Sequence, residues 1–269
     1  MPELDLLDWF IFLATGASAG LAAGYLGIGG GIVIVPALSV YLQAKFPDLT
    51  VPTQIAVATS LASILVTGSA AVITHYRRGA LQLQWLKIMA PGLFIGAIIG
   101  VVIADHISSQ VLLYIFLIFA LFSGLRMISG SSATYIIQRT NKIVIGFCGL
   151  FIGAFSSLLG IGGGTLTVPL LSALKLSIHR AVAIASAAGV VLAVSGTGTF
   201  VVTGLNTPNL PAGTLGYVYI PAFLGIIAAS VITAPLGARL VHKSRPGLIK
   251  RLFGISLILV AVRLFLQNL

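Results

Sequence analysis

Long apolar segments constrain this chain more than any other feature of its sequence. A helix that crosses a bilayer needs about 20 apolar residues, and six stretches meet that requirement: residues 54–75, 85–104, 110–129, 181–203, 213–240 and 246–266. Only 7% of the 269 residues are Asp, Glu, Lys or Arg, whereas about 25% is usual in soluble domains. The chain has too few polar residues to cover a water-exposed surface, so it is predicted to be an all-α polytopic membrane protein.

Two further apolar stretches, residues 9–43 and 143–174, are too long for one ordinary span, and each is interrupted by a glycine cluster followed by proline. The first contains GYLGIGGGIVIVPAL at 24–38 and the second SLLGIGGGTLTVPLL at 157–171. The similarity continues downstream, where Ala-Val-Ala at 56–58 recurs at 181–183. We therefore expect an internal duplication, with repeats at 1–135 and 136–269. Repeats of this size are the usual construction of secondary transporters.

The positions of the charged residues favour one topology of these repeats. If each long stretch crossed the membrane once, seven Lys and Arg would lie on one side and eight on the other. If each stretch turns back at its glycines, thirteen lie on one side, and the N-terminal side keeps Lys45, Arg263 and all five acids. The second distribution is the asymmetry expected of cytoplasmic loops. It also accounts for the net charge of +10 without nucleic-acid binding.

The predicted fold is therefore two inverted repeats, each a glycine-broken re-entrant helix hairpin followed by three transmembrane helices. Hairpin 9–43 would precede spans 54–75, 85–104 and 110–129, and hairpin 143–174 would precede spans 181–203, 213–240 and 246–266. The protein is expected in the cell (inner) membrane as a multi-pass protein with both termini outside the cytoplasm.

The glycine turns themselves are candidates for an anion site. Glycine permits the positive φ values of a tight reversal, and the start of the second arm leaves backbone N–H groups without helical partners. Such groups and the positive end of a helix bind anions without a charged side chain. The alternative is that the glycines only allow close helix packing. The candidate residues are Gly27, Gly29, Gly30, Gly31, Gly160, Gly162, Gly163 and Gly164, with Pro36 and Pro169 in structural roles.

With these two motifs and the Ala-x-Ala-Thr-Ser stretch at 56–60, the chain resembles the TauE/SafE sulfite-exporter-like family, of the toluene sulfonate uptake permease type. The resemblance covers nearly the whole chain. It implies a permease for sulfur-containing oxyanions such as sulfite, sulfoacetate or other organosulfonates. The second half departs from the pattern, since Ile184-Ala185-Ser186 stands where the first half has Thr59-Ser60. Only Ser186, displaced by one position, offers a matching hydroxyl.

Polar side chains near the turns are further candidates for binding the anion: Gln54, Thr59, Ser60, Thr165 and Ser186. Hydroxyls and amides can hydrogen-bond an oxyanion, although the same groups commonly bond between helices or back to the preceding turn. No Asp or Glu lies within a predicted span, so the usual carboxylate proton relay is missing.

An enzyme would need a nucleophile–base pair or metal ligands at membrane depth. The single cysteine, Cys148, and four histidines near loops do not provide either. We therefore expect no enzymatic activity, no metal and no cofactor. The expected partners are a small sulfur oxyanion, the lipid bilayer and a coupling ion, proton or sodium, that the sequence does not specify. The sequence specifies neither the oligomeric state nor which anion is moved. The predicted mechanism is alternating access, and an anion channel or a non-transporting membrane subunit are the alternatives.

Overall fold

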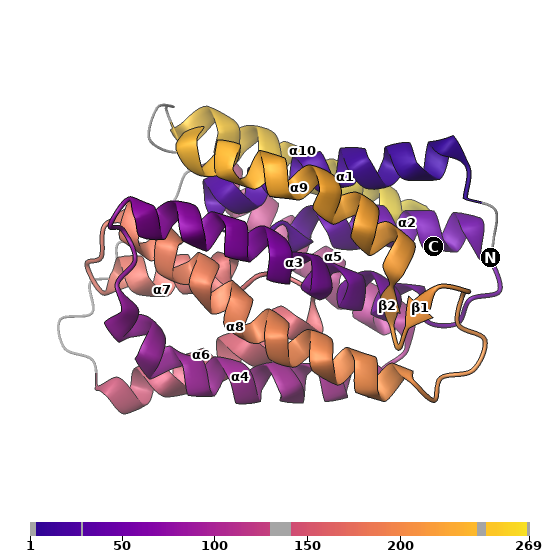
Figure 1. Cartoon of the computed structure of the whole chain (residues 1–269), viewed down its shortest axis with the longest axis horizontal. Helices are drawn as coiled ribbons and strands as arrows, with labels where there is room; N and C mark the ends of the chain where they lie inside the picture. Colours follow the sequence, from indigo (N-terminus) through magenta and orange to yellow (C-terminus); the bar gives the residue numbers. More distant parts are fainter. Residues whose placement is uncertain (1–3, 28, 130–140, 241–245, 268–269) are drawn as a thin grey trace.

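The structure, a computed structural model, describes residues 4–27, 29–129, 141–240 and 246–267. Within these ranges the chain forms helices and one short β-hairpin (Figure 1). The elements in the first half are α1 (Leu6–Leu26), α2 (Gly31–Lys45), α3 (Pro52–Arg77), α4 (Leu83–His106) and α5 (Ser109–Ser129). Those in the second half are α6 (Lys142–Leu158), α7 (Gly164–Ala173), α8 (Ile178–Gly204), β1 (Thr214–Leu215), β2 (Val218–Tyr219), α9 (Ile220–Leu240) and α10 (Pro246–Gln267).

Among the described residues, six helices are long and apolar enough to cross a membrane: α1, α3, α4, α5, α8 and α9. Together with the helical architecture they confirm the predicted class, an all-α polytopic membrane protein. The helices α3, α4, α5, α8 and α10 begin and end close to the corresponding predicted spans. Both long glycine-interrupted stretches are broken into two helices, α1 with α2 and α6 with α7.

The predicted span 213–240 was too long, because α9 begins only at Ile220. Residues before it form the β1–β2 hairpin, in which Thr214 pairs with Tyr219 and Leu215 with Val218. Two glycines permit this reversal, with φ values of 89° at Gly213 and 54° at Gly216. Gly216 also lies directly against the backbone of Val201 on α8, where a Cβ would overlap the carbonyl oxygen.

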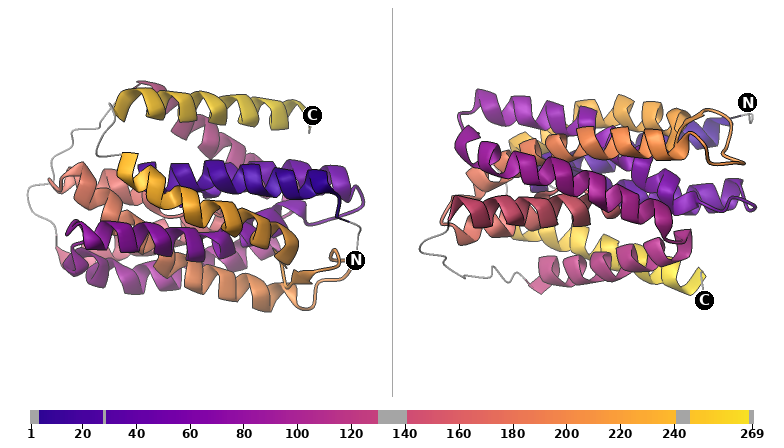
Figure 2. Two further views of the ribbon diagram at one scale, coloured as in Figure 1. Left: turned by 45° about the horizontal axis from the view of Figure 1, so that its top comes forward. Right: turned by 90° about the horizontal axis from the view of Figure 1, so that it is seen from below.

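Two helices occupy the centre of the bundle. In the most apolar window of α3 and of α8, 72% of the residues are buried, against 33% in α4 and in α9. The central pair packs together, while α5 and α10 pack on each other as an outer layer (Figure 2). In Figure 1, α1 begins and α2 ends at the same end of the bundle, and α6 begins and α7 ends at the opposite one.

Helices of the two halves also pack in a reciprocal pattern: α1 lies along α9, and α6 lies along α4. Small residues allow the close approach in both pairs. A Cβ on Gly24 of α1 would overlap the carbonyl oxygen of Ala234, and one on Gly96 of α4 would overlap that of Leu150. Helices in membranes associate through such small-residue contacts because lipid removes the hydrophobic driving force. The first helix of each glycine-interrupted stretch, α1 or α6, therefore packs against a helix of the other half.

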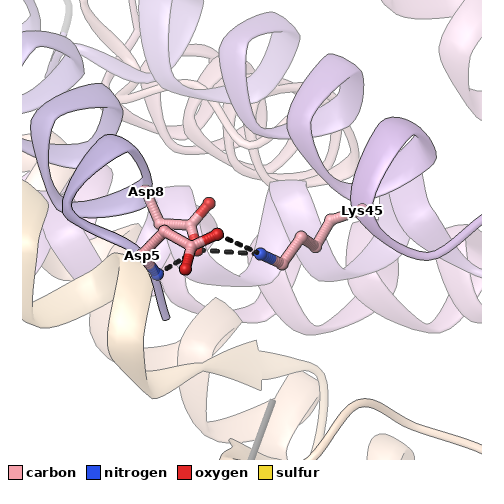
Figure 3. A network of polar contacts seen from close by, with 3 residues as sticks. All are labelled: Asp5, Asp8 and Lys45. Atoms are coloured by element: carbon pink, nitrogen blue, oxygen red, sulfur yellow. Dashed lines mark hydrogen bonds and ion pairs between the residues drawn. The ribbon is translucent and has the colours of Figure 1, made fainter. Parts of the chain in front are cut away.

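Polar contacts link neighbouring elements at the end of the bundle where α1 begins. Lys45, the last residue of α2, lies 3.0 Å from Asp8 and 3.7 Å from Asp5 (Figure 3). On the neighbouring β-hairpin the Tyr217 hydroxyl donates to Asp105 over 2.8 Å. Burial raises the pKa of the Tyr217 phenol, and the bond to Asp105 acts in the same direction. The phenol therefore stays protonated at neutral pH and holds the hairpin to the end of α4.

Candidate functional site

The two glycine turns, residues 27–30 and 159–163, lie against each other inside the bundle. A Cβ built on Gly29 would lie 2.7 Å from the Cα of Gly162, and one on Gly31 would overlap the carbonyl oxygen of Gly160. Both pairs are backbone-to-backbone contacts that only glycine permits. The described glycines of both turns are buried. The structure therefore brings together two segments that are far apart in the sequence.

Each turn also packs on the long helix of the other half that comes after that half's two shorter helices, α8 for the first turn and α3 for the second. A Cβ on Gly27 would lie 2.9 Å from Val182 Cγ1 on α8, and one on Gly160 would lie 2.9 Å from the Cα of Val57 on α3. Val57 and Val182 are the central residues of the two Ala-Val-Ala stretches. The contact between the turns is therefore flanked by equivalent positions of α3 and α8.

Several backbone N–H groups at the starts of α2 and α7 have no acceptor among the described residues. The carbonyl of Gly30 accepts from the N–H groups of Val33 and Ile34, and that of Gly163 accepts from Leu166 and Thr167. Several other N–H groups donate to no described residue, namely those of Gly29, Gly31, Ile32, Gly162, Gly163 and Thr165. They lie at the positive ends of two helices that meet, which is the geometry of a backbone anion site.

The predicted positive φ values occur mostly in the first turn. Gly27, Gly29 and Gly30 have φ of 70°, 78° and 81°. In the second turn Gly160 has φ of 67°, whereas Gly163 has φ of −29°. Pro36 and Pro169 both lie inside the second arms, α2 and α7. The two turns therefore reverse the chain with different backbone conformations despite their similar sequences.

Three of the predicted side chains lie beside the turns. Ser60 Oγ donates to the carbonyl of Gly160 over 2.7 Å. Ser186 Oγ donates over 3.0 Å to the carbonyl of Val182, the residue that contacts Gly27. Thr165 Oγ1, at the start of α7, is buried and has no partner among the described residues. Of the three hydroxyls, that of Thr165 is the one still free to donate to a ligand.

The other two predicted side chains form hydrogen bonds with backbone groups of neighbouring elements. Thr59 Oγ1 accepts from the N–H of Tyr219 on β2 over 2.9 Å. Gln54 Nε2 donates to the carbonyls of Ala104 (3.4 Å) and Ile107 (3.0 Å) at the end of α4. Gln54 lies six residues before Ser60, which places it about 9 Å along α3 at 1.5 Å per residue. Thr59 therefore holds the β-hairpin to α3, and Gln54 joins the start of α3 to the end of α4 at a distance from the turns.

Two residues at the turn contact were missed in the sequence. Ile64 Cγ1 would lie 3.3 Å from a Cβ on Gly29, and a Cβ on Gly189 would lie 3.7 Å from the Cα of Gly162. Gly189 is an isolated glycine in the middle of α8, and such a residue often marks a close backbone approach. That signal was present in the sequence. Ile64 carries no comparable signal, since it is one apolar residue among many on α3.

The arrangement defines a class of protein: a multi-pass helical membrane protein with two broken helices that meet in its interior, as in secondary transporters. In the described part of the chain no group of three or more His, Cys, Asp or Glu could hold a metal ion.

Residues 12–264 match the family described as "Sulfite exporter TauE/SafE". The chain belongs to this family, and the predicted resemblance is confirmed. The family consists of membrane transporters rather than enzymes.

Relatives along the whole chain carry the same general description. A probable membrane transporter protein of Haemophilus influenzae is 35% identical over 262 residues, covering 95% of this chain and 97% of the relative. The probable membrane transporter protein YunE of Bacillus subtilis is 26% identical over 287 residues, covering 98% and 99%. One from Methanocaldococcus jannaschii is 27% identical over 241 residues, covering 88% and 87%. No solved structure matches the chain.

Proposed function

We propose that this transporter moves small sulfur-containing oxyanions, such as sulfite, sulfoacetate or another organosulfonate, across the cell membrane by alternating access. The anion would bind between the two glycine turns. The observation that carries the proposal is the contact of Gly29 with Gly162, which joins the starts of α2 and α7. The family description names sulfite, and the turns offer N–H donors of the kind that an oxyanion requires.

Backbone donors suit a carrier because the ligand must leave as well as bind. An arginine or lysine at this depth would be costly in the membrane and would hold an anion tightly. The described part of the turns instead offers partial charges, with the Thr165 hydroxyl as an added donor. The turns are buried and in contact with each other in this structure, so they would have to separate to admit an anion during an alternating-access cycle.

The proposal includes the inverted topology, with repeats 1–135 and 136–269 and both termini outside the cytoplasm. The reciprocal packing of α1 on α9 and of α6 on α4 supports it. So does the position of the outer ends of α1 and α2 at one end of the bundle, and those of α6 and α7 at the other (Figure 1). An inverted pair of repeats would open to each side in turn by a rigid rocking motion about the turns.

Transport and binding are tested with the same purified protein. In proteoliposomes, uptake of radiolabelled sulfite should saturate and should accelerate when unlabelled sulfite is loaded inside. Sulfite or methanesulfonate should also raise the midpoint of thermal unfolding. Gly163→Leu, which adds bulk at the second turn, should abolish both effects. Gly198→Leu is the matched control, because a Cβ at Gly198 meets nothing within 4 Å.

The outcomes separate the alternatives. Flux that neither saturates nor responds to internal sulfite would indicate an anion channel. Absence of flux in the wild type would indicate a non-transporting subunit. If sulfite stabilises a folded Gly163→Leu variant as much as the wild type, the anion does not bind at the turns. Should that variant fail to fold, Thr165→Val keeps the side-chain shape and removes the free hydroxyl, and it should weaken stabilisation by sulfite.

The topology has a separate test. With Cys148 replaced by alanine, single cysteines at Leu4 and at Asp48, an exposed residue after α2, should react with an impermeant thiol reagent from the same side of the membrane, because the first glycine-interrupted stretch would turn back. Labelling from opposite sides would contradict the inverted arrangement.

A further inference from the structure

An open cavity of about 430 Å³, lined by both polar and apolar residues, lies where α3 and α5 begin. Its floor is formed by buried residues of α3 and α5, and its rim by more exposed residues of the loops before these helices, of the end of α2 and of the first turn of α5. The lining residues are Gln43, Leu49, Thr50, Pro52, Thr53, Ser108, Ser109, Gln110 and Leu113. A volume of this size is typical of small-molecule sites, and none of the lining residues is charged.

Two long helices begin at this cavity. α3 starts at Pro52 and runs for 26 residues, and α5 starts at Ser109 and runs for 21. Their first turns touch, since the N–H of Thr53 donates to Ser109 Oγ over 2.9 Å. The positive ends of both helices therefore face one space. This field favours an anion and disfavours a cation.

The cavity is also rich in hydrogen-bond donors that the protein does not use. Thr53 is only 1% exposed, and its Oγ1 has no partner among the described residues. Such a buried hydroxyl without a partner is costly unless a ligand or water satisfies it. Ser109 Oγ accepts from Thr53, and Ser108 Oγ accepts from the N–H of Val111 over 3.3 Å. Each of these two serines keeps its own proton for a further acceptor.

Carboxylates nearby do not occupy the cavity. Asp105, at the end of α4, accepts the hydroxyl of Tyr217. Asp48 belongs to the loop that precedes α3, and neither acid is among the lining residues. The cavity therefore presents hydroxyls, side-chain amides and helix starts to a ligand, and no anionic group of its own.

We propose that this cavity is a second binding site for a small sulfur oxyanion, separate from the turns and placed at the mouth of the transporter. The class of anion in this inference rests on the proposed function, whereas the cavity and its hydrogen-bond donors are observed independently of that function. Thr53 lies seven residues before Ser60 on α3, so the two sites are about 10 Å apart along one helix.

The test is calorimetric titration of the full-length protein in lipid nanodiscs with methanesulfonate and with sulfite, in a buffer whose anion is too bulky for the cavity. The wild type should bind two equivalents. Thr53→Val, which keeps the shape and removes the hydroxyl, should leave one equivalent or weaken the second about tenfold, the effect of losing a hydrogen bond to a charged ligand. Thr74→Val, at the other end of α3, is the control and should bind like the wild type, because Thr74 Oγ1 only bonds back to Ala70.

Comparison with Gly163→Leu separates this inference from the proposed function. Loss of one equivalent in Thr53→Val and of the other in Gly163→Leu supports both sites. A single wild-type equivalent that only Gly163→Leu removes would overturn the cavity site and leave the turn site standing. A single equivalent that only Thr53→Val removes would support the cavity and overturn the turns. No binding in the wild type would overturn both. If Thr53→Val does not fold, Gln110→Leu on the exposed rim replaces it and should weaken the same equivalent.

Discussion

The two glycine turns have similar sequences but differ in how tightly they are enclosed. Gly30 and Gly163 occupy the same position of the motif. Gly30 has φ of 81° and its Cβ would lie 2.7 Å from the carbonyl oxygen of Ala19, whereas Gly163 has φ of −29° and would meet the end of the Leu192 side chain at 3.0 Å. A carbonyl of a packed helix cannot move aside, but a leucine methyl can. At this position the first turn is therefore the more tightly enclosed of the two.

The turns also differ in the side chains that hold them. Ser60 on α3 donates to the carbonyl of Gly160, but Ala185 stands at the corresponding position of α8 and has no hydroxyl to offer Gly27. The arms differ too, with 21 and 15 residues in α1 and α2 against 17 and 10 in α6 and α7. The two turns thus share a sequence motif, but the contacts that support them differ.

The largest expected effect separates Gly30→Ala from Gly163→Ala. A side chain on Gly30 must adopt a left-handed backbone and displace Ala19, and the variant should lose about 3 kcal/mol of stability. Gly163→Ala needs only a shift of Leu192 and should lose less than about 1 kcal/mol. Unfolding midpoints in detergent measure both. Equal losses would show that the two turns are enclosed alike.

Removal of the Ser60 hydroxyl should have the next largest effect. Ser60→Ala leaves the buried carbonyl of Gly160 without this donor, and we expect a loss of about 1.5 kcal/mol. Ser63→Ala on the same helix is the control, because its Oγ only bonds back to the carbonyl of Thr59; its stability should change by less than about 0.5 kcal/mol. If both variants behave alike, Ser60 does not support the second turn.

A smaller effect is expected for Thr59→Val, which removes the acceptor for the N–H of Tyr219. The second half already has an apolar residue, Ile184, at the corresponding position. We expect a loss of about 1 kcal/mol and faster hydrogen exchange at the Tyr219 amide, read by mass spectrometry. An unchanged exchange rate at Tyr219 would mean that another group holds the β-hairpin in place.

The smallest effect is expected at the ion pair that joins α1 to α2 (Figure 3). Lys45→Met should lower the unfolding midpoint slightly, and the difference from wild type should shrink in high salt because part of the pair is exposed to solvent. Among the described residues no such pair joins α6 to α7: Asn141 occupies the position of Asp8 and accepts from the N–H of Ile143 at the start of α6. A difference that persists in high salt would assign the effect to packing.

Much of the fold could be predicted because apolar length and the duplicated motif are local features of the sequence. The spans and both helix breaks fall close to their predicted places. The exception, residues 213–219, forms a β-hairpin of which only residues 216–219 are buried, and hydropathy does not distinguish such a hairpin from the first turns of a helix. Gly213 and Gly216 were the available signal for that reversal.

The candidate site could be predicted only in part. The glycines were identified because a chain reversal needs them, but the contact between Gly29 and Gly162 depends on how the two halves pack. Side-chain partners depend on the same packing. The sequence therefore did not indicate that Ser60 donates a hydrogen bond to the carbonyl of Gly160, or that Gln54 donates one to a carbonyl at the end of α4. The membrane topology and the binding roles of these residues stay predictions.

The packing of α1 on α9 and of α6 on α4 has a consequence for assembly of the chain. The first helix of each half packs against a helix of the other half, as in two subunits that exchange an arm. During synthesis α1 is therefore made long before α9, and its small-residue face has no packing partner until α9 has been made. The two halves, produced as separate polypeptides, should each be unstable alone and recover their fold when made together.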